Sequence, residues 1–577
     1  MEKWIKALER GESLWIDQLR QEFERLEEPI KTVLRLCLPD GSLRELPLPL
    51  PRVEGEREQE LCFDYLSASV FNLLSAYGGR WLEIYTEKDS HLICALLPRL
   101  EERFMLREKQ RSGYGKCINV ADRISTAFGG ERFELRIKDI AGYAPIAEKA
   151  AESAENLGES LKSCAAKAEG LCCCGVDVGG TDVKLALSVN GELVSVKEFD
   201  WNPAESPVAE GYTEPIVLLS RLMRARAAAK GELAERLEKL MEKDAPLELI
   251  EKTVNEAEAA LGESINVLDA LGLSFPDVVI ENRIVGGETP KTKGMRENTA
   301  LDYEKEFLKI GLLKERLEEL CKAPGCVHIT NDGNMAAFTA AMELAMERPE
   351  EIGQGVIAHS LGTDFGSGWL DEDGKIPPLA LEMYDFLLDL GSRGKQSYEL
   401  EDLRSVRNEN STLPGARRYL GQAGVFRMAY ERKAQLLDGF TQWRGDTLVV
   451  PTAPGDLRKP CLEKLMQLAA GGEEDAEQVF VDVGRNLGHM CLEIDRMLKP
   501  KSRVRYLFGR FVKNSRCFEL ICRGCGEIIP GLELKAADDA LALTPLMKQL
   551  ARRTDVTVAQ FAQAVGAVYY ALQQSRL

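Results

Sequence analysis

The sequence predicts an α/β fold distributed over more than one globular lobe. The chain has 577 residues, which is more than one hydrophobic core usually supports. From Cys172 onward, short apolar runs are each followed by turn residues and then by helical spacing, which is typical of an α/β architecture. Two glycine-rich turns between strand-like runs lie almost two hundred residues apart. We therefore expect two lobes that each carry one such turn.

Composition and charge narrow the range of functions. Hydrophobic residues make up 45% of the chain and charged residues 29%, which excludes a mostly disordered protein. The net charge of -19 argues against a nucleic-acid partner, because phosphate backbones are bound by basic surfaces. No apolar run of about 18 residues appears, and residues 1–4 begin a charged, amphipathic segment instead of a signal peptide. These features predict a cytoplasmic protein that does not contact a membrane.

The first 168 residues differ in pattern from the rest of the chain. Helical spacing over 4–26 and strand-like runs at 32–38 and 81–85 predict an N-terminal α+β region. Residues 148–169 are rich in Ala, Glu and Lys and predict a helix that connects this region to the remainder of the protein. The region 1–168 contains no chemical motif, so its role is unknown.

The remainder of the chain is expected to form the two lobes. The first spans 172–335 and is interrupted by a charged helical insertion at about 204–263. The second spans 336–577, with a mostly helical insertion at about 398–475 that is broken by Pro and Gly. No internal repeat or low-complexity tract is evident in the sequence.

The strongest local motif is the first glycine turn. A strand ending near Asp177 is followed by Gly179, Gly180 and Thr181, and a second strand carries Lys184. Adjacent glycines let backbone amides approach phosphate oxygens, and Thr181 adds a hydroxyl. Asp177 is placed to hold Mg²⁺ through water. These residues predict a phosphate-binding turn, and an ordinary hairpin is the alternative.

The second glycine turn repeats the pattern. Gly362 and Thr363 lie between two strand-like runs in the segment 360–370. Two such turns fit an enzyme in which each lobe supplies one phosphate loop and the phosphates of a nucleotide lie between them. The two turns resemble the first and second phosphate motifs of the hexokinase and ROK (repressor/ORF/kinase) branches of the actin-like ATPase superfamily.

This resemblance covers roughly residues 172–577 apart from the two insertions. It implies two ribonuclease-H-like lobes with a central cleft, each built on a five-stranded mixed sheet, that close over ATP and substrate. The cofactors implied are ATP and Mg²⁺. The segment 504–511 is similar to the family's adenosine segment, and Gly509 is the residue expected to contact the nucleotide there.

The sugar-binding residues are also implied by the resemblance. Ser274, in the segment 271–276, and the tripeptide that begins Thr292-Lys293 are similar to hexokinase sugar signatures. Thr and Lys side chains suit sugar hydroxyls, because one is a short donor and acceptor and the other a long cationic donor. Glu382 occupies the place where these families carry a sugar-binding glutamate. On residue type alone, a solvated turn and a solvated helix carboxylate are the alternatives.

The catalytic base is expected at Asp332. Asn331 and Asp332 follow a short strand at 327–330 and precede helical spacing, so either could simply cap that helix. In the families that the chain resembles, the corresponding Asp is the general base and the Asn a sugar ligand. An alcohol is a poor nucleophile, and a carboxylate within hydrogen-bond reach can accept its proton.

Several residues depart from the family pattern. Asp182 and Asp364 add negative charge beside the two turns, which calls nucleotide affinity into question. The zinc-binding Cys cluster that ROK kinases carry after the second turn is missing from the sequence. The Cys522 and Cys525 pair has Cys-x-x-Cys spacing, but buried thiols are the expected state, and all fifteen cysteines are expected to be reduced.

Three functions remain open from the sequence. The first is an ATP-dependent kinase that phosphorylates a hydroxyl of a sugar or similar polyol, which makes the partners a nucleotide and a small molecule. The second is a catalytically weak, sugar-sensing regulator of the ROK type, whose DNA-binding version is disfavoured because residues 1–168 lack a basic helix-turn-helix segment. The third is an ATPase activator of the same superfamily. The identity of the sugar and the oligomeric state, with a homo-oligomer as one option, are left open.

Overall fold

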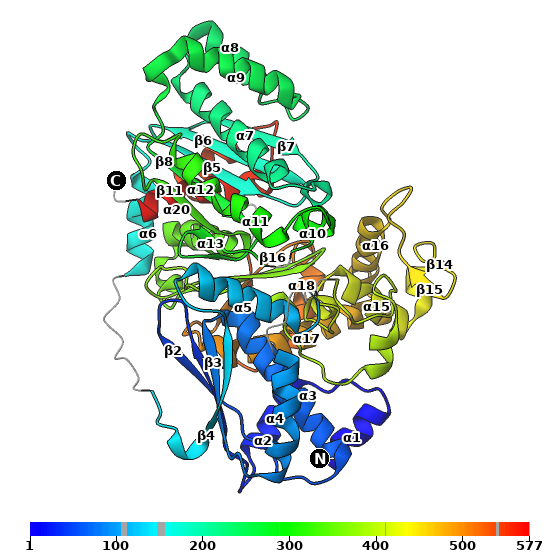
Figure 1. Cartoon of the computed structure of the whole chain (residues 1–577). Coiled ribbons are helices and arrows are strands. Elements are labelled where there is room, and N and C mark those ends of the chain that lie inside the picture. The colour runs from blue at the N-terminus through cyan, green and yellow to red at the C-terminus, as the bar shows by residue number, and fades with distance from the viewer. Residues whose placement is uncertain (105–111, 147–155, 288, 410, 538–541, 576–577) are drawn as a thin grey trace. The chain divides into compact units, whose positions relative to one another are not determined.

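The computed structural model describes residues 1–104, 112–146, 156–287, 289–409, 411–537 and 542–575 (Figure 1). These residues fall into two compact units. Unit 1 consists of Met1–Ala151, His359–Ser367 and Pro378–Ala536, and unit 2 of Glu152–Ala358, Gly368–Pro377 and Ala537–Leu577. The limits of the units differ from the three-part division expected from the sequence, since unit 1 contains both the N-terminal residues and most of the chain after 378.

Unit 2 is built on a five-stranded mixed sheet with the strand order β11-β8-β5-β6-β7. Antiparallel pairing joins β5, β6 and β7, whereas β8 and β11 run parallel to β5. This is the five-stranded mixed sheet expected for the first lobe, and the α/β prediction is confirmed. The strands are β5 (Cys172–Val178), β6 (Asp182–Val189), β7 (Glu192–Asp200), β8 (Ala270–Phe275) and β11 (Val327–Asn331).

Helices and two short strands complete unit 2. Helices α7, α8 and α9 lie in the segment 204–263, where helical spacing was expected. The predicted connecting helix at 148–169 is observed only as α6, and residues 148–155 lie outside the described part of the chain. The elements are α6 (Leu157–Ala166), α7 (Glu210–Ala228), α8 (Gly231–Lys239), α9 (Leu247–Leu261), β9 (Val279–Ile280), β10 (Arg283–Ile284), α10 (Lys293–Glu297), α11 (Tyr303–Gly311), α12 (Leu313–Glu318), α13 (Asp332–Glu347), α19 (Pro545–Ala551) and α20 (Val558–Gln574).

The two faces of this sheet pack against different helices. Cys174, Val176 and Val178 of β5 point to one face of the sheet and share a hydrophobic core with residues of α7. On the other side, α20 contacts β5, β6 and β8 (Figure 1). A methyl group at Gly175 or Gly272 would overlap the carbonyl oxygens of Ala564 and Ala567 on α20. Glycine at these two positions therefore lets the helix backbone lie directly on the sheet.

Unit 1 contains a four-stranded N-terminal sheet with the order β2-β1-β3-β4. The strands predicted at 32–38 and 81–85 are confirmed as β1 and β3. The predicted helical segment 4–26 is divided into α1 and α2 around Gly11, whose φ is +68°. The elements are α1 (Glu2–Glu9), α2 (Ile16–Glu24), β1 (Thr32–Cys37), β2 (Leu43–Pro47), α3 (Glu56–Tyr77), β3 (Trp81–Thr86), α4 (His91–Phe104), α5 (Gly115–Ala127) and β4 (Glu134–Asp139).

A second four-stranded sheet has the order β13-β12-β16-β17, and the turn between β12 and β13 belongs to unit 1. The insertion predicted as mostly helical at 398–475 contains three helices and also a small hairpin of β14 and β15. The elements are β12 (Val356–Leu361), β13 (Phe365–Leu370), α14 (Arg417–Leu420), α15 (Gln422–Arg432), β14 (Gln442–Arg444), β15 (Thr447–Val449), α16 (Arg458–Ala470), α17 (Glu474–Leu498), β16 (Val504–Phe508), α18 (Ser515–Ile528) and β17 (Glu533–Ala536).

The N-terminal region forms part of the core of unit 1. The Arg20 guanidinium pairs with the Glu493 carboxylate of α17, and both side chains are almost completely buried. Asn72 donates a 2.9 Å hydrogen bond to the same carboxylate, and the Tyr77 hydroxyl donates to the Met497 carbonyl. A buried ion pair with further hydrogen bonds requires close packing around it. Residues of α2 and α3 are therefore integral to unit 1.

The described residues can be assessed for membrane spans, for the state of the cysteines and for metal-binding groups. None of their helices combines the length and the apolar character that a membrane span requires. All fifteen cysteines lie among them as free thiols, as expected. Within the same residues, no three or more His, Cys, Asp or Glu side chains are grouped in a way that could hold a metal ion.

Candidate active site

Three parallel strands of unit 2 end at the same edge of the five-stranded sheet. In the strand register, Asp177 of β5 pairs with Ser274 of β8, and Phe275 of β8 pairs with Asn331 of β11. Asp332 directly follows Asn331 as the first residue of α13. Because the carboxyl ends of parallel strands meet at one edge, residues that are 155 positions apart in the sequence lie close together.

Asp177 is a half-buried carboxylate that other side chains surround. Burial raises its pKa to about 6, and the charges of Asp332 and Asp182 act in the same direction. The Ser274 hydroxyl donates a 2.8 Å hydrogen bond to Asp177 Oδ1, and this bond and the Lys184 charge oppose the rise. Ser274 itself is completely buried, so its hydroxyl orients the Asp177 carboxylate.

The first glycine turn closes directly after Asp177. The Gly179 N–H donates a 2.7 Å hydrogen bond to the Asp182 carbonyl, and a methyl group at Gly179 would lie 2.8 Å from Asp182 Oδ1. The Asp182 carboxylate pairs with Lys184 and accepts a 3.1 Å hydrogen bond from the exposed Thr181 hydroxyl. The negative charge that Asp182 adds to the turn is therefore balanced by the lysine of the same motif.

Asn331 is the residue that caps α13. Its Oδ1 accepts a 2.9 Å hydrogen bond from the Gly333 N–H, and its Nδ2 donates to the Asp277 carbonyl at 2.9 Å. A second N–H on Nδ2 remains for a ligand. The Gly333 N–H also lies 2.9 Å from Asp332 Oδ1, so Asp332 shares this donor with Asn331, while its side chain is 44% exposed at the sheet edge and its Oδ2 faces Lys291.

Lys291 is a site residue that the sequence analysis missed. Its ammonium lies 3.7 Å from Asp332 Oδ2, and a methyl group at Gly180 would lie 3.3 Å from its Cε atom. The side chain is 29% exposed. Lys291 thus extends from the glycine turn to the expected base, and its sequence signal is a lysine directly before the recognised Thr-Lys-Gly.

Thr292 and Lys293, which were expected to bind the sugar, contact residues other than Asp332. Thr292 is buried, and its hydroxyl lies 3.1 Å from the Tyr303 hydroxyl and donates to the Thr289 carbonyl at 3.2 Å. The Lys293 ammonium lies 3.7 Å from Glu297 one turn along α10, with 64% of its side chain exposed. The described contacts of these two residues lie within their own segment and α11, and do not involve Asp332.

The second glycine turn lies in unit 1 together with Gly509. The Gly362 N–H donates a 3.2 Å hydrogen bond to the Asp364 carbonyl, and Thr363 at the tip is exposed. Gly509 follows β16 with a φ of +99°, and a methyl group there would lie 2.8 Å from the Leu361 carbonyl carbon. Unit 1 thus brings together three residues that were assigned to nucleotide binding, namely Gly362, Thr363 and Gly509.

Glu382 lies in a buried charged cluster of unit 1. Its Oε2 accepts a 2.6 Å hydrogen bond from the Tyr384 hydroxyl and lies 3.2 Å from Lys116 Nζ. Lys116 also pairs with Asp385, and Asn408 donates to that carboxylate at 3.0 Å. Burial raises the pKa of Glu382. The partner of this glutamate is a lysine of α5, 266 residues away in the sequence, which no local pattern could identify.

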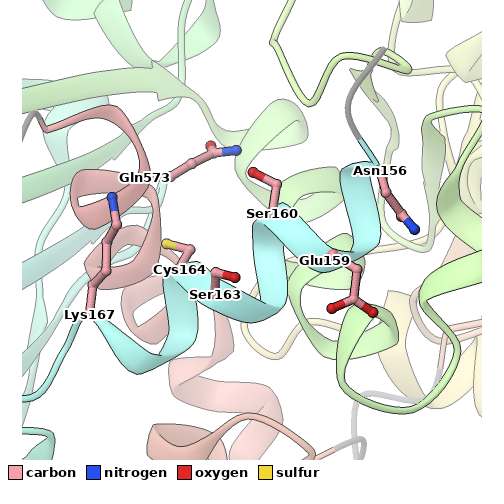
Figure 2. A pocket seen from close by; sticks show the side chains of 7 residues that line it. All are labelled: Asn156, Glu159, Ser160, Ser163, Cys164, Lys167 and Gln573. Carbon is pink, nitrogen blue, oxygen red and sulfur yellow. The ribbon is translucent and has the colours of Figure 1, made fainter. Parts of the chain in front are cut away.

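A separate surface cavity of about 420 Å³ lies along α6. Figure 2 shows the side chains that face it from this helix, with Gln573 of α20 opposite. None of the predicted site residues lines this cavity, so it is not part of the candidate active site. The lining residues are Asn156, Glu159, Ser160, Ser163, Cys164, Lys167 and Gln573.

The chain is similar in structure to ROK-family proteins. A ROK-family glucokinase from Streptomyces griseus in complex with glucose and AMPPNP has a TM-score of 0.37 and 16% identity, over 69% of this chain and 98% of the glucokinase. A ROK-family protein from Streptococcus pneumoniae in complex with sucrose has a TM-score of 0.38 and 15% identity, over 70% and 98%.

The similar structures also include a protein of another class. A ROK-family transcriptional regulator, a homologue of the E. coli MLC protein, has a TM-score of 0.37 and 13% identity, over 70% of this chain and 82% of the regulator. No family model and no curated protein matches the sequence.

Proposed function

We propose that the protein is an ATP-dependent kinase that phosphorylates a hydroxyl of a sugar or sugar-like polyol. The observation that carries this proposal is the pair of unlike carboxylates at one sheet edge of unit 2. Asp177 is half-buried and bonded to Ser274, whereas Asp332 is open and adjoins Lys291. Two carboxylates in such different environments suit two different tasks.

Asp332 is the proposed general base. Its exposed carboxylate can accept the proton of an attacking hydroxyl, while Asn331 keeps the start of α13 in place and offers an N–H to the substrate. Lys291 is placed to orient the Asp332 carboxylate or to bind the transferred phosphoryl group. We retain Thr292, Lys293 and Glu382 as proposed sugar ligands with less support, because described contacts within the chain already engage them.

The chemistry around Asp177 fits a magnesium ion. Burial and two neighbouring carboxylates leave Asp177 with a raised pKa, and a divalent cation would stabilise its ionised form. Mg²⁺ is usually held by one or two carboxylates together with waters and phosphates, so a single Asp177 is a sufficient protein partner. Bound there, the ion would neutralise charge on the phosphates. Ser274, which was expected to bind the sugar, is completely buried and bonded to Asp177, and we propose it instead as a positioning residue for Asp177.

Each unit, taken by itself, carries residues that we propose as nucleotide ligands. In unit 2 the backbone amides of the first turn, the Thr181 hydroxyl and the Lys184 ammonium suit phosphate oxygens. In unit 1 the backbone amides of the second turn and the Thr363 hydroxyl likewise suit phosphate oxygens. Because the glycines of the two turns and Gly509 have no side chain, their backbone stays accessible to a nucleotide. The proposed nucleotide ligands are Gly179, Gly180, Thr181, Lys184, Gly362, Thr363 and Gly509.

A coupled ADP-release assay with hexoses, amino sugars and polyols tests this function. Asp332→Asn should lower kcat by about 10²- to 10⁴-fold, which is the usual contribution of a positioned base, and should leave the affinity for MgATP unchanged. The cap at Asn331 is retained, so the fold should be kept. Asp373→Asn, at an exposed aspartate of the same unit, is the matched control. Equal turnover in Asp332→Asn and the parent would reject Asp332 as the base.

A catalytically weak sugar-sensing protein is the alternative function. It is favoured by one observation, namely that Asp182 and Asp364 each place a carboxylate beside a glycine turn, where negative charge opposes phosphate binding. Sugar binding in calorimetry without ADP release for any compound of the panel would support this alternative. Turnover that depends on Asp332 would exclude it.

A further inference from the structure

A carboxylate and a guanidinium meet at the second glycine turn. Asp364 directly follows Thr363, and its Oδ2 pairs with the guanidinium of Arg417. The Asp364 side chain is 46% exposed, whereas that of Arg417 is only 14% exposed. The turn thus carries an open negative charge that is balanced by a largely buried positive one.

The helical insertion around Arg417 contacts each residue of the turn. Arg417 is the first residue of α14, and the Gln422 N–H at the start of α15 donates a 2.9 Å hydrogen bond to the Gly362 carbonyl. A methyl group at Gly421 would lie 3.3 Å from the Thr363 carbonyl oxygen. The insertion therefore positions both the turn and the Arg417 side chain.

A buried hydrogen-bonded network that contains Tyr384 lies next to Arg417. The guanidinium carbon lies 5.7 Å from the ring centre of Tyr384. The Tyr384 hydroxyl donates to Glu382 Oε2 at 2.6 Å and accepts a 2.9 Å hydrogen bond from Lys116. Because its ring is fixed by these bonds, Tyr384 limits the positions that the guanidinium can occupy.

We propose that Arg417 is a phosphate-binding cation of the second turn and that Asp364 holds its guanidinium in place until a nucleotide binds. This inference rests on the proposed function, because it adds a ligand for the same nucleotide. A guanidinium binds phosphate oxygens with two parallel hydrogen bonds, as it binds a carboxylate. Asp364 Oδ1 accepts a 2.9 Å hydrogen bond from the Phe365 N–H, and the carboxylate can keep this bond while its Oδ2 exchanges Arg417 for water when a phosphate binds. Asp364 therefore competes with phosphate for Arg417 and, in the absence of a nucleotide, keeps the guanidinium at the turn.

A double-mutant cycle separates this role from simple neutralisation of Asp364. In the full-length protein, Arg417→Gln should weaken MgATP binding by roughly 10- to 100-fold, the loss expected for charged hydrogen bonds. Asp364→Asn should tighten it, because repulsion is removed and Arg417 is released. The Arg417→Gln/Asp364→Asn double variant should bind more tightly than Arg417→Gln, because the unpaired carboxylate is removed, but should remain weaker than both the parent and Asp364→Asn. Adenosine, which has no phosphate, should bind all four proteins equally.

Two outcomes would overturn the inference. If the double variant binds MgATP as tightly as the parent, Arg417 only neutralises Asp364. If adenosine loses affinity together with MgATP, Arg417 only supports the fold. Should Arg417→Gln not fold, Arg417→Lys in the Asp364→Asn background keeps the charge without the two-pronged geometry, and weaker MgATP binding than in Asp364→Asn alone is expected.

The failure of the inference can be distinguished from the failure of the proposed function. Absence of MgATP binding by the parent protein would overturn both. Binding by the parent, turnover that depends on Asp332, and unchanged affinity in Arg417→Gln would leave the proposed function in place and reject only the role of Arg417.

Discussion

Replacing Asp177 by asparagine should stabilise the folded protein near neutral pH while removing phosphate transfer. Burial raises the pKa of Asp177 from 3.8 to about 6, so the folded state binds this proton more tightly than the unfolded state does. One pKa unit corresponds to about 1.4 kcal/mol, so the ionised carboxylate costs the fold at most about 3 kcal/mol. Because the residue is only half-buried, we expect a gain of about 1–2 kcal/mol in the free energy of unfolding.

The stability gain of Asp177→Asn over the parent should increase with pH up to about pH 7. Below pH 3.8 the carboxyl is protonated in both states and contributes nothing. Between pH 4 and about 6 the unfolded chain ionises first, so the parent loses stability relative to the asparagine variant as the pH rises. Above about pH 7 the difference should be constant. The amide oxygen of the substituted asparagine would still accept the Ser274 hydroxyl, because that bond is made to Oδ1 in the parent.

Urea unfolding at pH 5, 6, 7 and 8 measures this gain, with Asp373→Asn as the exposed control. The stability difference between parent and Asp177→Asn should grow from pH 5 to pH 7 and then level off. A difference that is independent of pH, or a loss of stability at pH 7, would refute the reasoning from burial. The same variant should show no Mg²⁺-dependent turnover in the ADP-release assay.

Three further predictions concern single residues. Gly509→Ala should lower the free energy of unfolding by about 2–4 kcal/mol in a urea titration, because φ is +99° and the new methyl group meets the backbone of β12. Lys116→Met should lower it by about 3–5 kcal/mol by leaving two buried carboxylates unpaired. This loss should be smaller at pH 5 than at pH 8, since burial raises the pKa of Glu382 and favours its neutral form. Lys291→Met should lower kcat/KM by roughly tenfold or more, and by more than Lys293→Met does, because Lys291 lies beside Asp332 and Lys293 beside Glu297.

Matched controls accompany these three predictions. Gly526→Ala introduces a methyl group with no atom within 4 Å, so it should not destabilise the protein. Lys138→Met removes an exposed lysine of β4 and should have no pH-dependent effect on stability. Equal losses of kcat/KM in Lys291→Met and Lys293→Met would contradict the placement of Lys291 beside the base.

Local patterns in the sequence predicted the elements of the first sheet and the position of its polar residues. Apolar strands that carry Asp177, Ser274 and Asn331 at their last or next-to-last position are found where the sequence indicated, and the helix expected after Asn331 begins at Asp332. These features depend on neighbours within a few residues, through side-chain alternation and turn chemistry. They do not depend on where distant segments fold. The glycine turns were recognisable for the same reason.

Contacts between distant segments determined which of the charged residues became neighbours. Lys291 instead of Lys293 lies beside Asp332, because the chain reaches the sheet edge before α10 begins and the Lys293 side chain then points along that helix. Glu382 pairs with Lys116, and Asp364 with Arg417, only because the N-terminal region and the second insertion pack into unit 1. The sequence by itself determined which residues carry reactive groups and on which local elements they lie. The tertiary structure alone determined which charges are neighbours, because burial and pairing arise from packing between segments that are tens to hundreds of residues apart.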